Sequence, residues 1–408
     1  MSTDTLETIC HKEQLFFSGR DYFTSLLNSI NEATHRIDLE TYIFQEDHLG
    51  KTIAEALTNA AKRKVKVRLL VDGAGTPNWN RIIAEQLKQN GVQNRVFHPL
   101  PWRSWQWSLS KINTPFLQKF LYLFFHINSR NHRKTCIIDN KAVYIGSFNI
   151  RGNYFDSPEQ EIWRDTGVCL QNIDFTSINE AFLSAWHHVP IKERLKSIPK
   201  TFQDIAKRSA MQHYQNFKNK RYTSHIININ STIRLNNTWQ RRRLLYKNLL
   251  QKIRSAKQRI WITNAYFVPD NFLLRRLKAA AQRGLDVRIL LPKKADIPFM
   301  PWASSFFYQN LLKAGVRIFE YLPKLLHAKT VIIDDWMLVG SSNLNHRSLL
   351  HDLEVDVNVQ ANESKRNLEQ QFLDDLQNTE EILLSNWQNR PLRQKIIGRL
   401  VLYLKYWI

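Results

Sequence analysis

A short pattern of polar residues occurs twice in this sequence of 408 residues and constrains the fold more than any other feature. The first copy comprises His132, Lys134, Asp139, Gly146, Ser147 and Asn149. The second copy comprises His327, Lys329, Asp334, Gly340, Ser341 and Asn343. One His-x-Lys pair carries little information, but two copies with the same following residues indicate one composite site built from two repeated halves.

Each copy of the pattern predicts a β-hairpin. The four residues after Lys134 and after Lys329 are β-branched or apolar, which is typical of a buried strand. Acidic and amide residues then supply a turn, and a second apolar strand leads back to Gly-Ser-x-Asn. Because side chains two apart on a strand share a face, the histidine and lysine of each copy point the same way.

The residue types of the pattern suit phosphoryl chemistry. Lysine and asparagine donate hydrogen bonds to phosphate oxygens, and glycine lets the backbone come close to a ligand. Donors aimed at a phosphate under attack stabilise its transfer. Since the pKa of imidazole is about 6.5, one histidine can attack phosphorus while the other protonates the leaving oxygen. The residues themselves do not tell which histidine does which.

No metal or other cofactor is expected at this site. A zinc site involving Cys136 and the histidines is the alternative, but no Cys-x-x-Cys or His-x-x-x-His spacing accompanies them. Lysine is also a poor metal ligand. The sequence therefore favours a reaction in which cationic side chains neutralise the phosphate.

The duplication extends beyond the two motifs. Residues 33–44 resemble 256–267, and residues 61–70 resemble 281–290. In each half, strands alternate with helical runs before the hairpin, which predicts two α/β domains, each a mixed sheet flanked by helices. We expect them to be related by a pseudo-twofold axis, with the active site at their interface. The expected parts are a first domain at 1–190, a basic connector at 191–238, a second domain at 239–385 and a basic amphipathic tail at 386–408.

The first half carries an insertion at about 100–128 that the second half lacks. It combines aromatic residues with arginine and lysine, which is typical of a segment lying in a membrane interface. The candidate membrane-contact residues are Trp102, Trp105, Trp107, Phe120 and Phe124, with Trp407 in the tail. The alternative is that each segment packs on its own domain. We favour the interface for the insertion, whereas for the tail the two readings are evenly balanced.

Charge and cysteine content bear on partners and location. The chain has 58 Lys and Arg against 36 Asp and Glu, a net charge of +22, which favours an anionic membrane surface or a nucleic acid as partner. Three cysteines predict no disulfide framework and hence a reducing compartment. The first residues lack the features of a signal peptide, and no segment has the pattern of a transmembrane helix. We expect a peripheral protein on the cytoplasmic face of the cell membrane.

The double His-x-Lys-x4-Asp pattern resembles that of the phospholipase D superfamily. The second copy differs from the first by one residue fewer between Asp334 and Gly340, which predicts a hairpin turn shortened by one residue. The resemblance implies that His132 is the nucleophile and His327 the general acid. It also implies that Asp165 and Glu354 support the histidines, for which ordinary surface ion pairs are the alternative.

Within the superfamily, the chain most resembles bacterial cardiolipin synthases of the short type, which lack N-terminal transmembrane helices. The resemblance covers roughly residues 12–190 and 240–385. It implies transphosphatidylation between two phosphatidylglycerol molecules through a phosphatidyl-histidine, with release of glycerol. The alternatives are a phospholipase D that uses water, a nuclease with the same chemistry, and a non-catalytic binding protein. The aromatic insertion argues against nucleic acid as partner, and the oligomeric state stays open.

Overall fold

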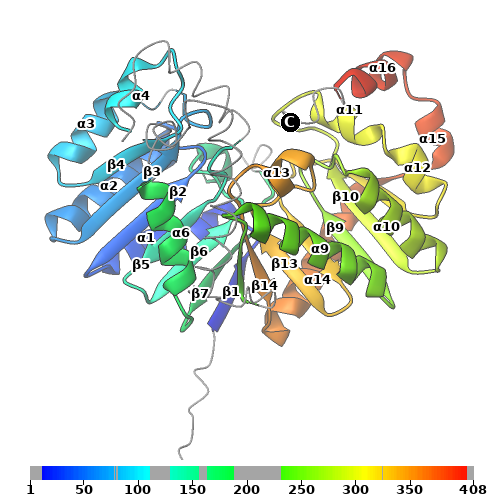
Figure 1. The fold of residues 1–408 in the computed structure, drawn as a ribbon, viewed down its shortest axis with the longest axis horizontal. Helices are drawn as coiled ribbons and strands as arrows, with labels where there is room; N and C mark the ends of the chain where they lie inside the picture. Colours follow the sequence, from blue (N-terminus) through cyan, green and yellow to red (C-terminus); the bar gives the residue numbers. More distant parts are fainter. Residues whose placement is uncertain are drawn as a thin grey trace, which may run out of the picture.

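The computed structural model of the protein describes residues 12–77, 79, 81–110, 129–155, 163–187, 231–323 and 325–401. These residues form two α/β units that lie side by side, each with a central sheet and flanking helices (Figure 1). Both sheets are mixed, because parallel and antiparallel pairs occur in each. The predicted fold class is therefore confirmed.

The first unit contains a seven-stranded sheet in the order β1-β7-β6-β5-β2-β3-β4. Its strands are β1 (Lys12–Phe16), β2 (Arg36–Thr41), β3 (Lys66–Asp72), β4 (Gln93–Phe97), β5 (Thr135–Ile138), β6 (Ala142–Gly146) and β7 (Gly167–Gln171). Its helices are α1 (Gly19–Glu32), α2 (His48–Lys62), α3 (Arg81–Gln89), α4 (Ser104–Ser108), the 3-10 helix η1 (Gly152–Tyr154) and α6 (Thr176–Trp186).

The second unit contains an eight-stranded sheet in the order β15-β11-β10-β9-β12-β13-β14-β8. Its strands are β8 (Ile233–Leu235), β9 (Arg259–Thr263), β10 (Asp286–Pro292), β11 (Arg317–Tyr321), β12 (Thr330–Ile333), β13 (Trp336–Gly340), β14 (Val355–Val359) and β15 (Thr379–Ile382). Its helices are α9 (Trp239–Ser255), α10 (Asn271–Gln282), α11 (Met300–Ser305), α12 (Tyr308–Leu312), α13 (His346–Leu350), α14 (Asn362–Gln377), α15 (Leu384–Gln388) and α16 (Leu392–Val401).

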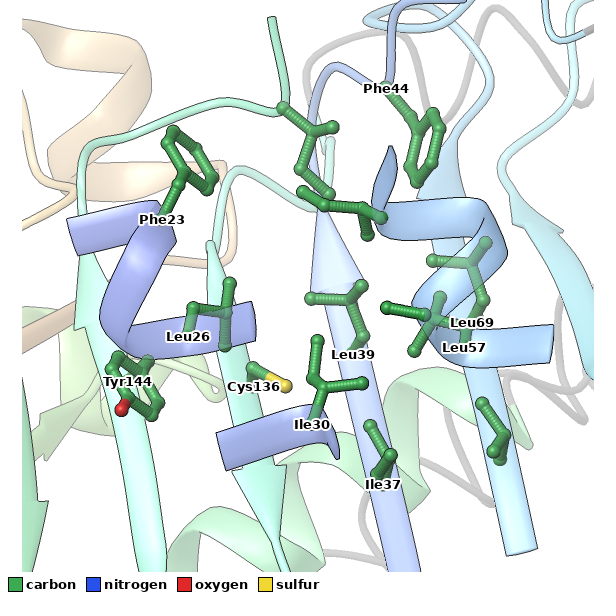
Figure 2. Close-up of a cluster of buried hydrophobic side chains, with 14 of the residues drawn as sticks. Phe23, Leu26, Ile30, Ile37, Leu39, Phe44, Leu57, Leu69, Cys136 and Tyr144 are labelled. Carbon is green, nitrogen blue, oxygen red and sulfur yellow. The ribbon is translucent and has the colours of Figure 1, made fainter. Parts of the chain in front are cut away.

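Helices cover the sheet of the first unit because their apolar residues recur on one face. Leu26 and Ile30 of α1 and Leu57 of α2 lie over Ile37 and Leu39 of β2 (Figure 2). The helices begin where side chains satisfy their first backbone N–H groups. The Ser18 hydroxyl accepts from Asp21 N, and the Asp47 carboxylate accepts from Gly50 N.

The same strand arrangement brings both histidine motifs to one edge of their sheets. β5 runs antiparallel to β2, and β12 runs antiparallel to β9. His132 precedes β5 and His327 precedes β12, so each histidine lies where the parallel strands of its unit end. We call this side of the two sheets the histidine edge.

The hairpin of the second unit has the shortened turn that its sequence predicts. Three residues connect Ile138 to its partner Ala142, whereas two connect Ile333 to Trp336. The shortening does not shift the pairing near the motif, because Thr135 faces Ile145 and Thr330 faces Val339. The two Gly-Ser-x-Asn segments therefore keep the same register against their lysines.

The two units share a hydrophobic core. Ile137 and Val143 of the first sheet belong to the same buried cluster as Val355 and Val357 of the second. Backbone bridges also cross between the units, from Asn131 to Leu353 and from Arg164 to Leu326. The active-site hairpins are thus held by both halves together.

The predicted connector and tail are only partly described. β8 lies within the predicted connector at 191–238 and forms the outer strand of the second sheet, so that sheet begins earlier than expected. Residues 188–230 and 402–408 lie outside the described residues. In the tail, α16 packs on α11 so closely that a Cβ at Gly398 would lie 2.4 Å from the Trp302 carbonyl oxygen.

Candidate active site

Backbone hydrogen bonds tie each motif histidine to the opposite unit. His132 N donates to Leu353 O over 3.0 Å, and His327 N donates to Arg164 O over 2.8 Å. The residue after each of these acceptors is an acid. Glu354 directly precedes β14, and Asp165 lies two residues before β7. The exchange of backbone bonds therefore carries a carboxylate from each half to the histidine of the other.

The side chains complete this crossed arrangement. The Nδ1 atom of His132 lies 2.9 Å from Glu354 Oε1, and the Nδ1 atom of His327 lies 2.7 Å from Asp165 Oδ2. A carboxylate is an acceptor, so each Nδ1 carries the proton and the chemistry falls to Nε2, which in His327 lies 3.2 Å from Lys329 Nζ. The structure thus brings Asp165 and Glu354 into contact with the two histidines, as the superfamily resemblance implies.

Hydroxyl groups orient the two carboxylates. Ser147 Oγ and Tyr154 Oη donate to Asp165, while Ser341 Oγ and Ser348 Oγ donate to Glu354. The structure therefore places the two motif serines behind the histidines, on the supporting acids.

Sequence reasoning missed Tyr154 and Ser348, although the repeat contains a signal for them. Each hydroxyl lies five positions after the motif asparagine, Asn149 or Asn343. An aromatic ring that was also missed lies beside each histidine, with the centroid of Tyr42 5.0 Å from His132 and that of Tyr266 6.2 Å from His327.

The two motif lysines are buried beside the histidines. Lys134 Nζ donates to His132 O over 2.7 Å, and Lys329 Nζ donates to His327 O over 2.5 Å. Burial lowers the pKa of Lys134 to about 7 and that of Lys329 to about 8. A bound anion reverses this shift because it favours the charged ammonium, so the two lysines gain charge when a phosphate enters.

The two motif asparagines are also buried, close behind the hairpins. Asn149 Oδ1 accepts from Ile43 N over 3.2 Å, which fixes the orientation of its amide. Asn343 N donates to Ser348 Oγ, while its buried Oδ1 has no hydrogen-bond partner among the described residues.

The motif glycines serve strand packing. A Cβ at Gly146 would lie 2.6 Å from Gly167 Cα, and a Cβ at Gly340 would lie 2.5 Å from Asp356 Cα. Only glycine lets the second hairpin strand lie this close to the next strand of its sheet.

The structure places the two motif aspartates away from the histidines, at the far ends of β5 and β12. About seven extended residues separate Asp139 from His132, on the order of 20 Å. Asp139 accepts hydrogen bonds from the backbone N atoms at 34–36, and Asp334 accepts from those at 257–259. The expectation that these carboxylates act in catalysis is corrected to a structural role, in which they hold the turns that lead into β2 and β9.

Electrostatics distinguish the two histidine–carboxylate pairs. Burial, followed by the charges of Lys134 and Lys329, lowers the pKa of His132 well below 6.5. Burial also raises the pKa of its partner Glu354 to about 7.

The second pair contains an ionised carboxylate. Burial alone would raise the pKa of Asp165, but attraction and hydrogen bonding to His327 hold it well below its usual range. Burial and Lys329 lower the pKa of His327, and Asp165 opposes this shift. The pKa of His132 is therefore lowered further than that of His327, so His132 is the more completely neutral imidazole. The partner of His327 is the more completely ionised carboxylate.

The membrane-contact candidates differ in exposure. Trp102 is 60% exposed, whereas Trp107 is 6% exposed and its Nε1 donates to Leu100 O over 2.8 Å. Trp105 is half-buried and bonds Trp79 O over 2.9 Å. Trp107 is therefore a packing residue of the first unit, contrary to expectation. Phe120, Phe124 and Trp407 lie outside the described residues.

Comparison with known proteins agrees with this architecture. A family model described as "Cardiolipin synthase, PLD-like domain" matches residues 26–171 and 249–376. A cardiolipin synthase of Clostridium perfringens (strain SM101 / Type A) is 31% identical over 384 residues, which is 94% of this chain and 74% of the relative. The major cardiolipin synthase ClsA of Bacillus subtilis (strain 168) is 30% identical over 376 residues, with 92% and 70% covered.

Solved structures support the fold at low sequence identity. A phosphatidylserine synthase of Haemophilus influenzae Rd KW20 superposes with a TM-score of 0.65 at 13% identity, covering 96% of this chain and 92% of that one. A polyphosphate kinase of Porphyromonas gingivalis superposes with a TM-score of 0.58 at 14% identity, covering 97% and 53%. Among the described helices, none combines the length and apolar character needed to cross a membrane.

Proposed function

The chain belongs to the family of cardiolipin synthases with phospholipase D-like domains, and we propose that it joins two phosphatidylglycerol molecules into cardiolipin and releases glycerol. One observation of the site carries the proposal. Two histidines from different units each bond, through Nδ1, a carboxylate from the other unit. Such a pair provides a nucleophile and an acid in one site, as a two-step displacement at phosphorus requires.

In the first step, Nε2 of neutral His132 attacks phosphorus of the donor lipid. The bond from phosphorus to the glycerol oxygen breaks, and His327 gives this oxygen its proton. The low pKa of His132 suits the nucleophile, because only neutral imidazole attacks. Asp165 supports His327 as the general acid, because its negative charge stabilises protonated His327. The bound phosphodiester anion adds to this effect.

In the second step, a hydroxyl of a second phosphatidylglycerol attacks phosphorus. His327 takes its proton, and the bond from phosphorus to His132 breaks, so both histidines return to their first state. Lys134 and Lys329, with the amides of Asn149 and Asn343, stabilise the phosphate oxygens in both steps. Ser147 and Ser341 support the site through the carboxylates that they bond.

The proposed substrates place the enzyme at a membrane, to which it is attached peripherally. Cys136 and Cys169 are buried free thiols of the first unit, which fits a reducing compartment and therefore the cytoplasmic face of the cell membrane. The family relatives favour lipid substrates over nucleic acid.

The test is to incubate the purified protein with phosphatidylglycerol vesicles in EDTA and to analyse the lipids by mass spectrometry. We expect cardiolipin and free glycerol from the wild type and neither product from His132→Ala. Phosphatidic acid without cardiolipin would show that water is the acceptor and would contradict the transferase. Cleavage of DNA without lipid turnover would indicate a nuclease instead.

A further inference from the structure

Large exposed apolar side chains gather at the histidine edge of the second unit. α10 follows β9 directly, so its first residues lie where β9 ends. α9 leads into β9 from the opposite direction, so its first residues lie at the same edge. Trp239 opens α9 and is 64% exposed, and Phe272 lies in the first turn of α10 and is 61% exposed.

Hydrogen bonds tie α9 to the start of α10 and to α13 beside the active site. Tyr246 Oη of α9 donates to Asp270 Oδ1, which also caps α10, over 2.5 Å. Arg242 of α9 donates to Leu350 O of α13. The same helix contains Ser348, whose hydroxyl donates to the active-site carboxylate of Glu354. Trp239 and Phe272 are therefore fixed on rigid elements beside the site, and neither is covered by another part of the described structure.

Cationic side chains surround these two rings. Arg243 lies with its guanidinium carbon 5.4 Å from the Trp239 ring centroid, and Arg275 lies 5.2 Å from the Phe272 centroid. Both arginines are exposed, and so is Arg276 on the next position of α10. The patch thus combines aromatic rings with positive charge, the combination that favours the interface of an anionic bilayer.

The same edge carries exposed apolar residues elsewhere. Trp102 follows β4, whose end lies at the histidine edge of the first unit. Ile396 and Leu400 of α16 are 56% and 58% exposed, and α16 packs on α11, which follows the end of β10. Exposed apolar groups from both units therefore lie on the side where the two histidines meet.

We propose that the starts of α9 and α10, with Trp239, Phe272, Arg243 and Arg275, form a surface that docks the protein on an anionic phospholipid bilayer with its active site facing the lipid. The inference rests on the proposed function in that this bilayer contains the substrates. Docking through this edge presents the histidine pair to headgroups at the membrane surface. A protein that acts on lipids while attached peripherally needs such an arrangement, because its substrate must reach the site without leaving the bilayer entirely.

The test measures co-sedimentation with vesicles of phosphatidylglycerol and, separately, of phosphatidylcholine. We compare the wild type with Trp239→Ser/Phe272→Ser and Arg243→Gln/Arg275→Gln. The matched control is Leu383→Ser, since Leu383 is 56% exposed but follows β15, which ends at the opposite edge. A second readout is the turnover of a short-chain phosphatidylglycerol that is monomeric in solution, which needs no docking.

We expect each double variant to bind phosphatidylglycerol vesicles at least tenfold more weakly, and Leu383→Ser to bind as the wild type does. Turnover of the short-chain substrate stays unchanged in all variants. Equal vesicle binding by wild type and double variants overturns the proposal, as does a dimeric wild type that becomes monomeric in Trp239→Ser/Phe272→Ser without losing vesicle binding. If the wild type turns over no lipid but vesicle binding still depends on these residues, the proposed function fails and the docking surface stands.

Discussion

At the scale of single residues, the two histidines look alike in sequence but differ in their surroundings. The repeat places an imidazole, a lysine and a serine-bonded carboxylate in each half. The difference lies in the carboxylates, since Asp165 is held ionised whereas burial raises the pKa of Glu354 to about 7. Sequence spacing cannot show this, because the pKa depends on burial and on side chains that come from the opposite unit.

Neutralising the two acids should therefore have unequal effects. Asp165→Asn removes a full negative charge from protonated His327, and we expect kcat to fall on the order of 10²-fold or more. Glu354→Gln replaces a group that is already partly protonated at neutral pH, and we expect a fall of about tenfold. Steady-state kinetics of cardiolipin formation at pH 7 check this order, and an equal loss in both variants would contradict the asymmetry.

The buried lysines predict how activity depends on pH. kcat/KM reports the free enzyme, in which Lys134 and Lys329 lose their protons at pH values of about 7 and 8. Because the uncharged amines no longer attract phosphate, we expect kcat/KM to fall as the pH rises from 6.5 to 9. kcat reports the complex, where the bound phosphate raises both pKa values, so its decline begins at higher pH. A kcat/KM that stays constant over this range would contradict the account.

At the scale of elements, the hairpins and their alternating strands and helices were predictable, because period-two patterns and turn residues are local. Even the shortened second turn could be read from the spacing. The burial of Trp107 and the strand β8 inside the predicted connector could not, because neither follows from a local sequence pattern. Trp107 bonds the carbonyl of Leu100 in the loop after β4, and β8 is three residues that pair with the distant strand β14.

The motif aspartates act at the scale of elements, because their carboxylates hold the turns that precede β2 and β9. Asp139→Ala or Asp334→Ala removes an acceptor for three backbone N–H groups, and we expect a loss of about 1–2 kcal/mol in the free energy of unfolding, with kcat unchanged. The exposed neighbour Asp335 provides the control, Asp335→Ala, which should leave stability unchanged. Urea unfolding with parallel kinetics checks this, and a large loss of kcat in the folded variants would return these residues to the chemistry.

The same contacts make the free energy of unfolding depend on pH in the acid range. Hydrogen bonds from backbone N–H groups lower the pKa of Asp139 and Asp334 despite their partial burial. A carboxylate with a lowered pKa contributes stability above its unfolded value of about 3.9. That contribution is lost as the pH falls through the lower pKa of the carboxylate in the folded protein. The difference in the free energy of unfolding between wild type and Asp139→Ala should therefore vanish at strongly acidic pH.

At the scale of the whole molecule, the site exists only where the two units meet. Each histidine takes its backbone partner and its carboxylate from the other half, and a common core lies behind both hairpins. The twofold repeat predicted this meeting, but only the structure shows that each supporting acid crosses to the histidine of the other half. Next to His132 in the sequence, Arg133 forms a buried ion pair with Glu40 in the first unit, with 3.0 Å between Arg133 Nε and Glu40 Oε1.

This buried pair makes the first unit sensitive to a single change. Arg133→Ala leaves Glu40 charged and buried, and we expect a loss of about 3–5 kcal/mol in the free energy of unfolding. The exposed pair of Arg317 with Glu381 is the control, and Arg317→Ala should cost less than about 1 kcal/mol. Denaturant unfolding of the two variants checks the difference, which similar losses would contradict.

The most direct test of the central claim is to trap the covalent intermediate in His327→Ala. A phosphatidyl ester of p-nitrophenol supplies a leaving group that needs no acid, so the first step proceeds, whereas the second lacks its base. We predict a burst of one equivalent of nitrophenolate and a phosphatidyl adduct that peptide mass spectrometry locates on His132. Absence of the burst, or an adduct on any other residue, would contradict a composite site in which His132 is the nucleophile.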